Sequence, residues 1–300
     1  MGNSALNEKV YWLHAIAPLH IGAGRGVGYI DLPIAREKAT NWPYVPGSAV
    51  KGVIADKWSA TDENRKQNAE FAAAFGRANQ DSDTLADANA GSLVFSDASI
   101  VCLPVRSFYG TYAWITSPLA LKRLRCPEIP GNIPVPPGES VFVLEGNKVS
   151  SNATAYFEDI DLEVDTNKQN DSTLVSVCGL LANSIFTDDT EWQEIFKQRF
   201  AVVNDDIFTF LCDTGTSVDA RIRIDDATKI VADGALWYEE SLPIDTILAG
   251  VVWCDKVYAK ELTAQELLGK FCSSPLDLQI GGKASTGKGR VRCIFSGGRE

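Results

Sequence analysis

Two glycine-rich stretches contain the residues whose types and spacing could bind a phosphate chain. Residues 22–28 carry glycine at every second position, and a second stretch covers residues 281–289. The first has Val27 where a G-x-G-x-x-G motif needs glycine, and the second has Gly289 where a P-loop needs its magnesium-binding Ser or Thr. Neither is therefore a nucleotide-hydrolysing motif. Two readings stay open: tight turns, or loops whose backbone N–H groups flank an extended polyanion.

Few residues could perform acid–base or metal chemistry. The two histidines are His14, within the alternation of the first predicted strand, and His20, at the mouth of the first glycine-rich loop. His14 fits a core position, whereas His20 is a candidate for chemistry. Asp31 stands alone after the loop, where it either caps a turn or acts in catalysis. The common hydrolase and metalloprotease motifs are absent, and the seven cysteines are spaced singly without a C-x-x-C pair, as buried reduced thiols would be.

The charge of the chain qualifies the phosphate hypothesis. The net charge is −11, which alone disfavours a nucleic-acid binder. Residues 154–275 hold 23 acidic and 9 basic residues, so the acidity is concentrated there. Four basic residues near the second glycine-rich stretch have no acidic residue among them: Lys283, Lys288, Arg290 and Arg292. Local basic elements can still bind RNA. Dissolved salt screens charges that are more than about 8 Å apart, so nearby charges affect binding more than the total charge does.

Two strand–helix–strand units must position these residues. The first comprises a strand at residues 9–17, covered on both faces, the first glycine-rich loop, and a helix at residues 49–59 capped by Ser48. In the second unit, Thr263 and Glu266 form a capping box that starts a helix at residues 263–271. Its strands are expected at residues 250–259, 276–280 and 289–295. Two such units predict an α+β fold with a ferredoxin-like or RRM-like sheet and large insertions.

The middle of the chain supplies the insertions. Helical spacing occurs at residues 174–186 and 191–200, and residues 221–237 indicate a polar, projecting hairpin. No apolar run reaches the 18 residues that a membrane span requires, and the first residues lack the pattern of a secretory signal. We therefore expect a cytoplasmic protein with no membrane partner.

Several sequence blocks, in a fixed order over almost the whole chain, carry a family resemblance. They are residues 20–24, 28–37, 43–52, 91–98, 104–107, 114–124, 234–243 and 281–289. Together they resemble the RAMP superfamily of CRISPR proteins, and most closely the repeated backbone subunit of the type III-B (Cmr) effector complex. The resemblance implies one RAMP domain over residues 1–300: a palm of about residues 9–59, 91–145 and 249–297, an inserted segment at about 60–90, and a β-hairpin thumb at about 205–245.

The function that the resemblance implies is an endoribonuclease. Copies of the subunit would stack helically along a guide (cr) RNA beside other Cmr complex subunits, and each would cut the paired target RNA once per segment. The cofactor would be Mg²⁺ or another divalent cation. Two alternatives stay open, a scaffold that coats guide RNA without cutting it and a guide-RNA-processing endonuclease. Asp31 favours cutting, and the scarcity of histidines disfavours processing.

The resemblance also assigns roles to single residues. Asp31 falls on the family's catalytic aspartate, where it would hold the metal ion or accept the proton of the attacking ribose 2′-hydroxyl. Three further catalytic candidates match: His20, Tyr238 and Glu240. The RNA-binding candidates are Arg25, Arg36, Ser48, Lys51, Gly282, Lys283, Lys288 and Arg290.

Overall fold

The computed structural model describes residues 7–24, 26, 28–59, 68–77, 89–124, 126–224, 231–258 and 261–296. Within these residues a 13-stranded sheet has the main order β16-β17-β1-β15-β6-β7-β12-β8-β11-β10-β9, with β2 paired to β6 and β5 to β15. Its strands are β1 (Glu8–Ala15), β2 (Tyr44–Val45), β5 (Val94–Phe95), β6 (Ala98–Arg106), β7 (Tyr112–Thr116), β8 (Ser140–Val143), β9 (Ser150–Ser151), β10 (Thr154–Phe157), β11 (Ile160–Val164), β12 (Phe200–Val202), β15 (Ile247–Trp253), β16 (Leu276–Gln279) and β17 (Arg290–Ser296).

Two strand pairs stand apart from this sheet, β3 (Gly76–Arg77) with β4 (Asn89–Ala90) and the hairpin of β13 (Ser217–Ile224) with β14 (Val231–Ser241). The α-helices are α1 (Gly47–Trp58), α3 (Ala69–Phe75), α4 (Pro118–Arg123), α5 (Ser172–Ile185), α6 (Thr190–Arg199), α7 (Asp205–Thr214) and α8 (Ala264–Phe271). None of the described helices is long and apolar enough to cross a membrane.

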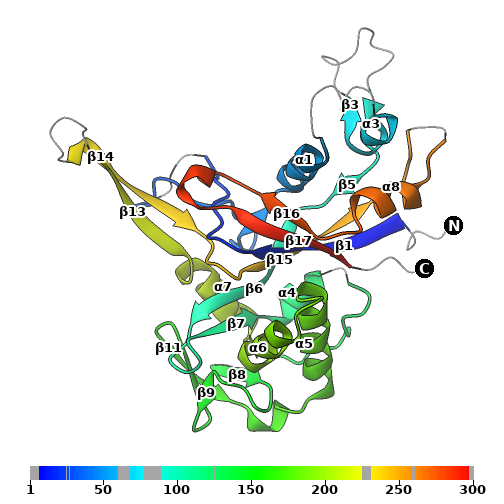
Figure 1. Cartoon of the computed structure of the whole chain (residues 1–300). Coiled ribbons are helices and arrows are strands. Elements are labelled where there is room, and N and C mark those ends of the chain that lie inside the picture. Colours follow the sequence, from blue (N-terminus) through cyan, green and yellow to red (C-terminus); the bar gives the residue numbers. More distant parts are fainter. Residues whose placement is uncertain are drawn as a thin grey trace.

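The centre of the sheet is a ferredoxin-like palm, as the sequence predicts. The strands β17, β1, β15 and β6 are adjacent and antiparallel, so in chain order the four palm strands lie 4-1-3-2. Helix α1 leads from β1 towards β6, and helix α8 leads from β15 to β16 and β17. Figure 1 shows both helices on one side of these strands. Two β-α-β units packed in this way form the α+β class.

Strand β1 lies at the middle of the core and is covered on both faces, as predicted. Tyr11 and Leu13 pack in the hydrophobic cluster that contains α1 and α8. Val10 and Trp12 alternate with them and pack in a second cluster, which contains α5 and α6. The period of two in a strand sends successive side chains to opposite faces, so a strand buried on both sides is apolar throughout.

The second half of the sheet forms a lobe beneath the palm. The strands β7 and β12 pair in parallel, as do β11 and β8, whereas β12 pairs with β8 in an antiparallel manner. Helices α5 and α6 cover this lobe at the residues where helical spacing predicts them (Figure 1). All seven cysteines are buried and free, which fits their interpretation as small core residues.

Two local predictions were wrong. Ser48 is exposed and does not cap α1; the helix begins after Pro46, and the Asp97 carboxylate accepts a hydrogen bond from the Gly47 amide at 2.8 Å. The hairpin is not polar throughout. On one face, the cross-strand partners Ile222 and Leu236 are both more than half exposed. Directly opposite residues share a face, so the hairpin has a polar face and an apolar one.

Candidate active site

The two glycine-rich loops lie side by side, as they must if β1 and β17 are neighbours. These strands pair antiparallel, which brings the end of β1 to the start of β17. Beyond the strands the Gly289 amide donates to the Pro18 carbonyl at 2.9 Å, and the Gly282 amide donates to the His20 carbonyl at 2.9 Å. The two loops are therefore adjacent, as the interpretation that they flank one polyanion requires.

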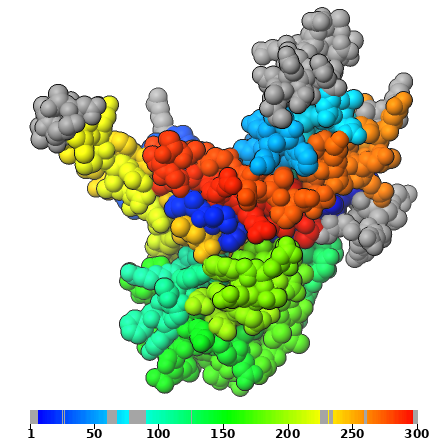
Figure 2. All heavy atoms as spheres, in the orientation of Figure 1, coloured from blue at the N-terminus to red at the C-terminus, as the bar shows by residue number. Residues whose placement is uncertain are grey.

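Strand β14 is the third element of the site, and it brings the hairpin to the two loops. The Leu19 and Leu242 backbones exchange two hydrogen bonds of 2.9 Å. The Leu32 amide donates to the Tyr238 carbonyl at 3.1 Å, and the Leu32 carbonyl accepts from the Glu240 amide at 3.0 Å. The segment around Asp31 is thus fixed along the free edge of β14. The hairpin itself projects away from the palm (Figures 1 and 2).

Asp31 is an exposed carboxylate held in one orientation. Its Oδ2 accepts a hydrogen bond from the Tyr238 amide at 2.8 Å, while Oδ1 has no partner among the described residues. Gly26 packs against the same segment: a Cβ added to Gly26 would lie 2.4 Å from the Ile30 carbonyl oxygen and 2.9 Å from the Asp31 Cα. A carboxylate oriented by the backbone with one free oxygen can bind a cation or accept a proton.

His20 is buried beneath the loops, and its tautomer follows from its contact. Its Nδ1 lies 2.6 Å from the Glu240 carbonyl oxygen, which can only accept a hydrogen bond. Nδ1 therefore carries the proton, and in the neutral ring Nε2 is the acceptor. A Cβ on Gly22 would lie 3.3 Å from Nε2, so that nitrogen faces the first glycine-rich loop. His14, by contrast, is a buried residue of β1 that pairs with Asp245 at 2.9 Å.

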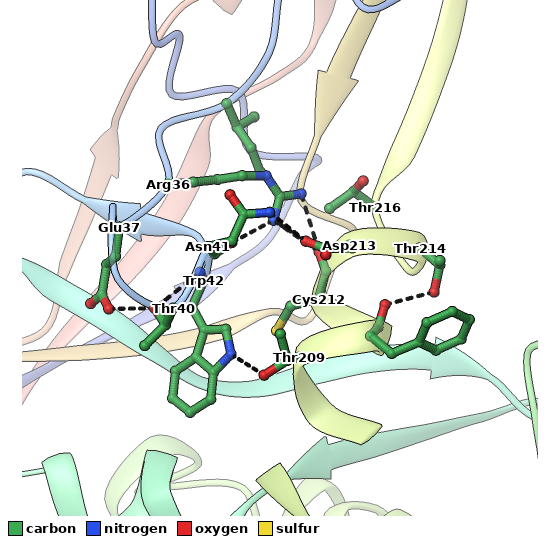
Figure 3. A network of polar contacts seen from close by, with 12 residues as sticks. Arg36, Glu37, Thr40, Asn41, Trp42, Thr209, Cys212, Asp213, Thr214 and Thr216 are labelled. Carbon is green, nitrogen blue, oxygen red and sulfur yellow. Dashed lines mark hydrogen bonds and ion pairs between the residues drawn. The ribbon is translucent and has the colours of Figure 1, made fainter. Parts of the chain in front are cut away.

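Glu240 is a buried carboxylate that joins three elements. Its Oε1 accepts from Arg36 at 2.6 Å and from Thr216 at 2.9 Å, and its Oε2 accepts from the Ile34 amide at 3.0 Å. Arg36 also donates to the Cys212 carbonyl oxygen at the end of α7 and to Asp213 (Figure 3). A helix C-terminus favours a cation, so this ion pair fixes residues 34–36, which follow the first glycine-rich loop, to α7 and to the hairpin.

A comparison with known proteins assigns the family of this chain. Residues 12–292 match the family model of the RAMP superfamily. The chain belongs to the RAMP superfamily. It is 31% identical over 289 residues to the CRISPR system Cmr endoribonuclease Cmr4 of Pyrococcus furiosus, covering 93% of this chain and 92% of that protein.

Solved structures of RAMP proteins share the fold. An oligomeric Cmr4 from Pyrococcus furiosus superposes with a TM-score of 0.70 at 23% identity, covering 97% of this chain and 98% of that chain. A type III-B Cmr-beta complex bound to cognate target RNA contains a chain that superposes with a TM-score of 0.71 at 20% identity, covering 98% of each chain. These likenesses show that the mixed α+β fold described above is that of the RAMP superfamily.

The RNA-binding candidates of this RAMP chain lie in different surroundings. Ser48 and Gly282 are exposed, and Arg290 is exposed beside Asp277 at 3.2 Å. Lys51 donates to the Leu93 carbonyl oxygen at 2.8 Å, and partial burial lowers the pKa of its ammonium group. Arg25 lies outside the described residues. RNA contacts by these residues stay a prediction.

Three other basic candidates are paired with carboxylates. Arg36 contacts Glu240, Lys283 donates to Glu239 at 2.7 Å, and Lys288 donates to Asp219 at 2.9 Å. Lys288 is only 3% exposed. The structure thus gives these three side chains partners within the protein, and their predicted RNA contacts also stay untested.

The described residues of this RAMP chain suit a divalent cation only in one mode. No group of three or more His, Cys, Asp or Glu side chains in the described part of the chain could hold a metal ion. Asp31 offers an exposed carboxylate beside the glycine-rich loops, and its Oδ1 has no partner among the described residues. Mg²⁺ commonly binds through one or two carboxylates and keeps several waters or substrate phosphates. A cation here would take Asp31 from the protein and its other ligands from RNA and water.

The sequence did not identify Glu239 of β14, a carboxylate at the base of the hairpin, as a residue of the site. Glu239 is 3% exposed, and it accepts from both Lys283 and the Trp237 indole at 2.7 Å. Burial pushes the pKa of Glu239 upwards, but these hydrogen bonds and the lysine charges outweigh it, so the pKa lies below its usual value. One sequence signal could have pointed to Glu239. Residues 283–292 contain four basic residues and no acidic residue, so any carboxylate partners had to come from elsewhere in the sequence.

Proposed function

We propose that this chain is the repeated backbone subunit of a type III-B CRISPR effector complex, which binds guide RNA and cuts complementary target RNA at regular intervals. The observation that carries the proposal is the exposed Asp31 carboxylate, fixed by the Tyr238 amide at the edge of a projecting hairpin. The RAMP family membership and the relative named as a Cmr endoribonuclease support it. Its partners would be guide RNA, target RNA, further copies of the chain and other Cmr subunits.

The apolar face of the hairpin supports a cutting role. Ile222 and Leu236 lie opposite each other on this face, and Tyr238 follows on the same side nearer to Asp31. All three side chains are exposed. A base pushed out of its stack can pack against such a surface, which would offset the few kcal/mol that unstacking costs. The hairpin would thus act as a wedge, with the carboxylate beside its base.

The chemistry would be attack of a ribose 2′-hydroxyl on the neighbouring phosphorus, which would form a 2′,3′-cyclic phosphate and break the bond to the 5′-oxygen of the next nucleotide. That oxygen would take a proton from water and leave as a hydroxyl. A regular RNA helix holds the 2′-oxygen out of line with the bond that breaks, so displacing one nucleotide is what allows in-line geometry. Asp31 would accept the hydroxyl proton at its free Oδ1 or hold a hydrated cation there, while Oδ2 keeps its bond to Tyr238. When bound, a divalent cation would neutralise the charge that develops on the phosphate.

Removal of divalent cations tests the metal dependence that we propose. We expect EDTA to reduce cutting of a complementary RNA by the reconstituted complex to background, and excess Mg²⁺ to restore it. Guide RNA retention in a gel shift should stay unchanged, because Asp31 supplies a catalytic rather than a binding contact. Cutting at the full rate in EDTA would instead assign Asp31 to proton transfer alone. Retention of target without any cutting, with Mg²⁺ present, would favour the non-cleaving scaffold.

Gly26→Ala tests the placement of Asp31. The added Cβ would meet the Ile30 carbonyl oxygen and the Asp31 backbone, and backbone atoms cannot yield as a flexible side chain does. We expect cutting to fall about tenfold or more, since displacing a reacting group by about 1 Å can cost a hundredfold. Gly52→Ala is the matched control, because a Cβ there meets nothing within 4 Å. Equal cutting by the two variants would show that Asp31 does not depend on this packing.

A further inference from the structure

Two carboxylates face each other at the base of the hairpin. Asp219 of β13 and Glu239 of β14 are direct cross-strand partners, on the polar face opposite to the exposed apolar residues. Like charges in this position destabilise a strand pair. Arg221 of β13 lies 3.4 Å from Asp219 and 3.6 Å from Glu239. One loop supplies two further cations: Lys283 donates to Glu239 at 2.7 Å, and Lys288 donates to Asp219 at 2.9 Å. We call Lys283, Lys288, Asp219, Glu239 and Ser241 the hairpin clamp.

Lys288 is the central member of the clamp, because it bonds both strands of the hairpin at once. Its ammonium group also lies 3.2 Å from the Ser241 hydroxyl of β14. Its backbone is held on either side, since the Lys288 carbonyl oxygen accepts from Gln279 at 2.6 Å and the next amide, that of Gly289, donates to Pro18. A lysine buried to this degree must be paired, and its pairing fixes the loop to the hairpin.

The loop and the hairpin also meet in the space-filling view. Figure 2 shows the red segment of the second glycine-rich loop against the yellow base of the hairpin. Lys283 has a second contact there, since its Nζ lies 5.9 Å from the centre of the Trp237 ring. The clamp therefore consists of two ion pairs and one hydroxyl contact, and the cation–π contact with Trp237 lies beside it. All of these contacts join this loop to the two hairpin strands.

Strand β14 connects the hairpin clamp to Asp31, the candidate catalytic carboxylate. Its residues 238–241 each bond a different partner: the Tyr238 amide holds Asp31, Glu239 holds Lys283, Glu240 holds Arg36, and Ser241 holds Lys288. A strand is stiff over so short a span. A shift of the hairpin base would therefore move the amide that orients Asp31.

We propose that Lys283 and Lys288 are positioning residues, which set the hairpin and, through β14, Asp31, instead of contacting RNA phosphates. The proposal rests on the proposed function for its link to cutting. Three facts favour it over a phosphate contact: Lys288 is only 3% exposed, both lysines already have carboxylate partners, and those partners are cross-strand neighbours. A phosphate would have to displace the Asp219 carboxylate, which is 44% exposed, from the buried Lys288 ammonium group.

Two substitutions at one ion pair separate the explanations. Asp219→Asn removes a negative charge, and Lys288→Met removes the positive one at similar length. If the clamp positions the hairpin, both variants lower the cutting rate at saturating target by about tenfold or more. Their guide RNA affinity and its salt dependence should match the wild type. Lys256→Met is the matched control, because Lys256 is exposed and follows β15 at the end of the sheet opposite to the glycine-rich loops.

Hydrogen exchange of the β14 amides, measured on the chain without RNA, provides a readout that is independent of cutting. We expect both clamp variants, and not Lys256→Met, to exchange faster in β14 while amides of α5 keep the wild-type rate. Unchanged exchange would overturn the proposal. A second result would also overturn it: Lys288→Met binds guide RNA more weakly, and its slope of log affinity against log salt concentration is smaller by about 0.7, whereas Asp219→Asn binds guide RNA as well as or better than wild type. If the wild type itself cuts no RNA, the proposed function fails, and the exchange data still decide whether the clamp exists.

Discussion

Asp31→Asn should reduce target cutting by about a hundredfold or more, with guide RNA binding and target retention unchanged. The reason lies in the contact that orients this side chain. Asparagine has nearly the same volume, and its side-chain oxygen can still accept the hydrogen bond from the Tyr238 amide. Only the negative charge is lost, so the variant separates the chemistry of the carboxylate from its packing. The measurement is the single-turnover rate of cutting by the assembled complex.

A matched control for Asp31→Asn is Asp188→Asn. Asp188 is also an exposed carboxylate, but it lies in the turn between α5 and α6, away from the glycine-rich loops and the hairpin. This variant should cut at the wild-type rate. Should Asp31→Asn cut as fast as Asp188→Asn, then Asp31 only anchors its loop to β14, and a group other than Asp31 performs the cut.

Glu240→Ala should be the most destabilising single change at the site, by about 3–5 kcal/mol in the free energy of unfolding. Glu240 is 3% exposed, and the Arg36 side chain that it neutralises is 16% exposed. Removing the carboxylate leaves a largely buried guanidinium with only the more exposed Asp213 as its charge partner. It also leaves the Ile34 amide and the Thr216 hydroxyl without their acceptor. Urea unfolding followed by circular dichroism measures the effect as a lower midpoint with an unchanged slope.

An exposed ion pair provides the comparison for Glu240. Glu194 pairs with Lys197 on the surface of α6, where its side chain is 61% exposed. Such pairs contribute about 0–1 kcal/mol, so Glu194→Ala should change the unfolding midpoint little. Equal midpoints for the two variants would show that Glu240 does not hold residues 34–36, α7 and the hairpin together.

The palm could be predicted from the sequence because its signals are local. The capping box of Thr263 and Glu266 starts α8 as expected. In residues 9–17 both alternating sets of side chains are largely apolar, which predicted a strand covered on both faces. Two strand–helix–strand units then leave few topologies for a shared sheet. The adjacency of the two glycine-rich loops followed from that sheet.

The parts that could not be predicted depend on contacts between distant segments. Ser48 looked like the cap of α1, but Asp97, about 50 positions later, accepts the first helical amide instead. Lys288 looked like a phosphate ligand because no acid stands near it in sequence, whereas its partner Asp219 comes from the hairpin. Residues 221–237 contain both charged and apolar residues, and only the cross-strand register sorts these onto two faces.

The most direct test of the account is the chemistry and position of the cut ends. The reconstituted complex is incubated with complementary RNA and Mg²⁺, and both product ends are mapped. Attack by the 2′-hydroxyl beside Asp31, once at each hairpin, predicts evenly spaced cuts that leave 2′,3′-cyclic phosphates and 5′-hydroxyls, all absent with Asp31→Asn. Irregular positions, or 5′-phosphate ends that persist in Asp31→Asn, would contradict it.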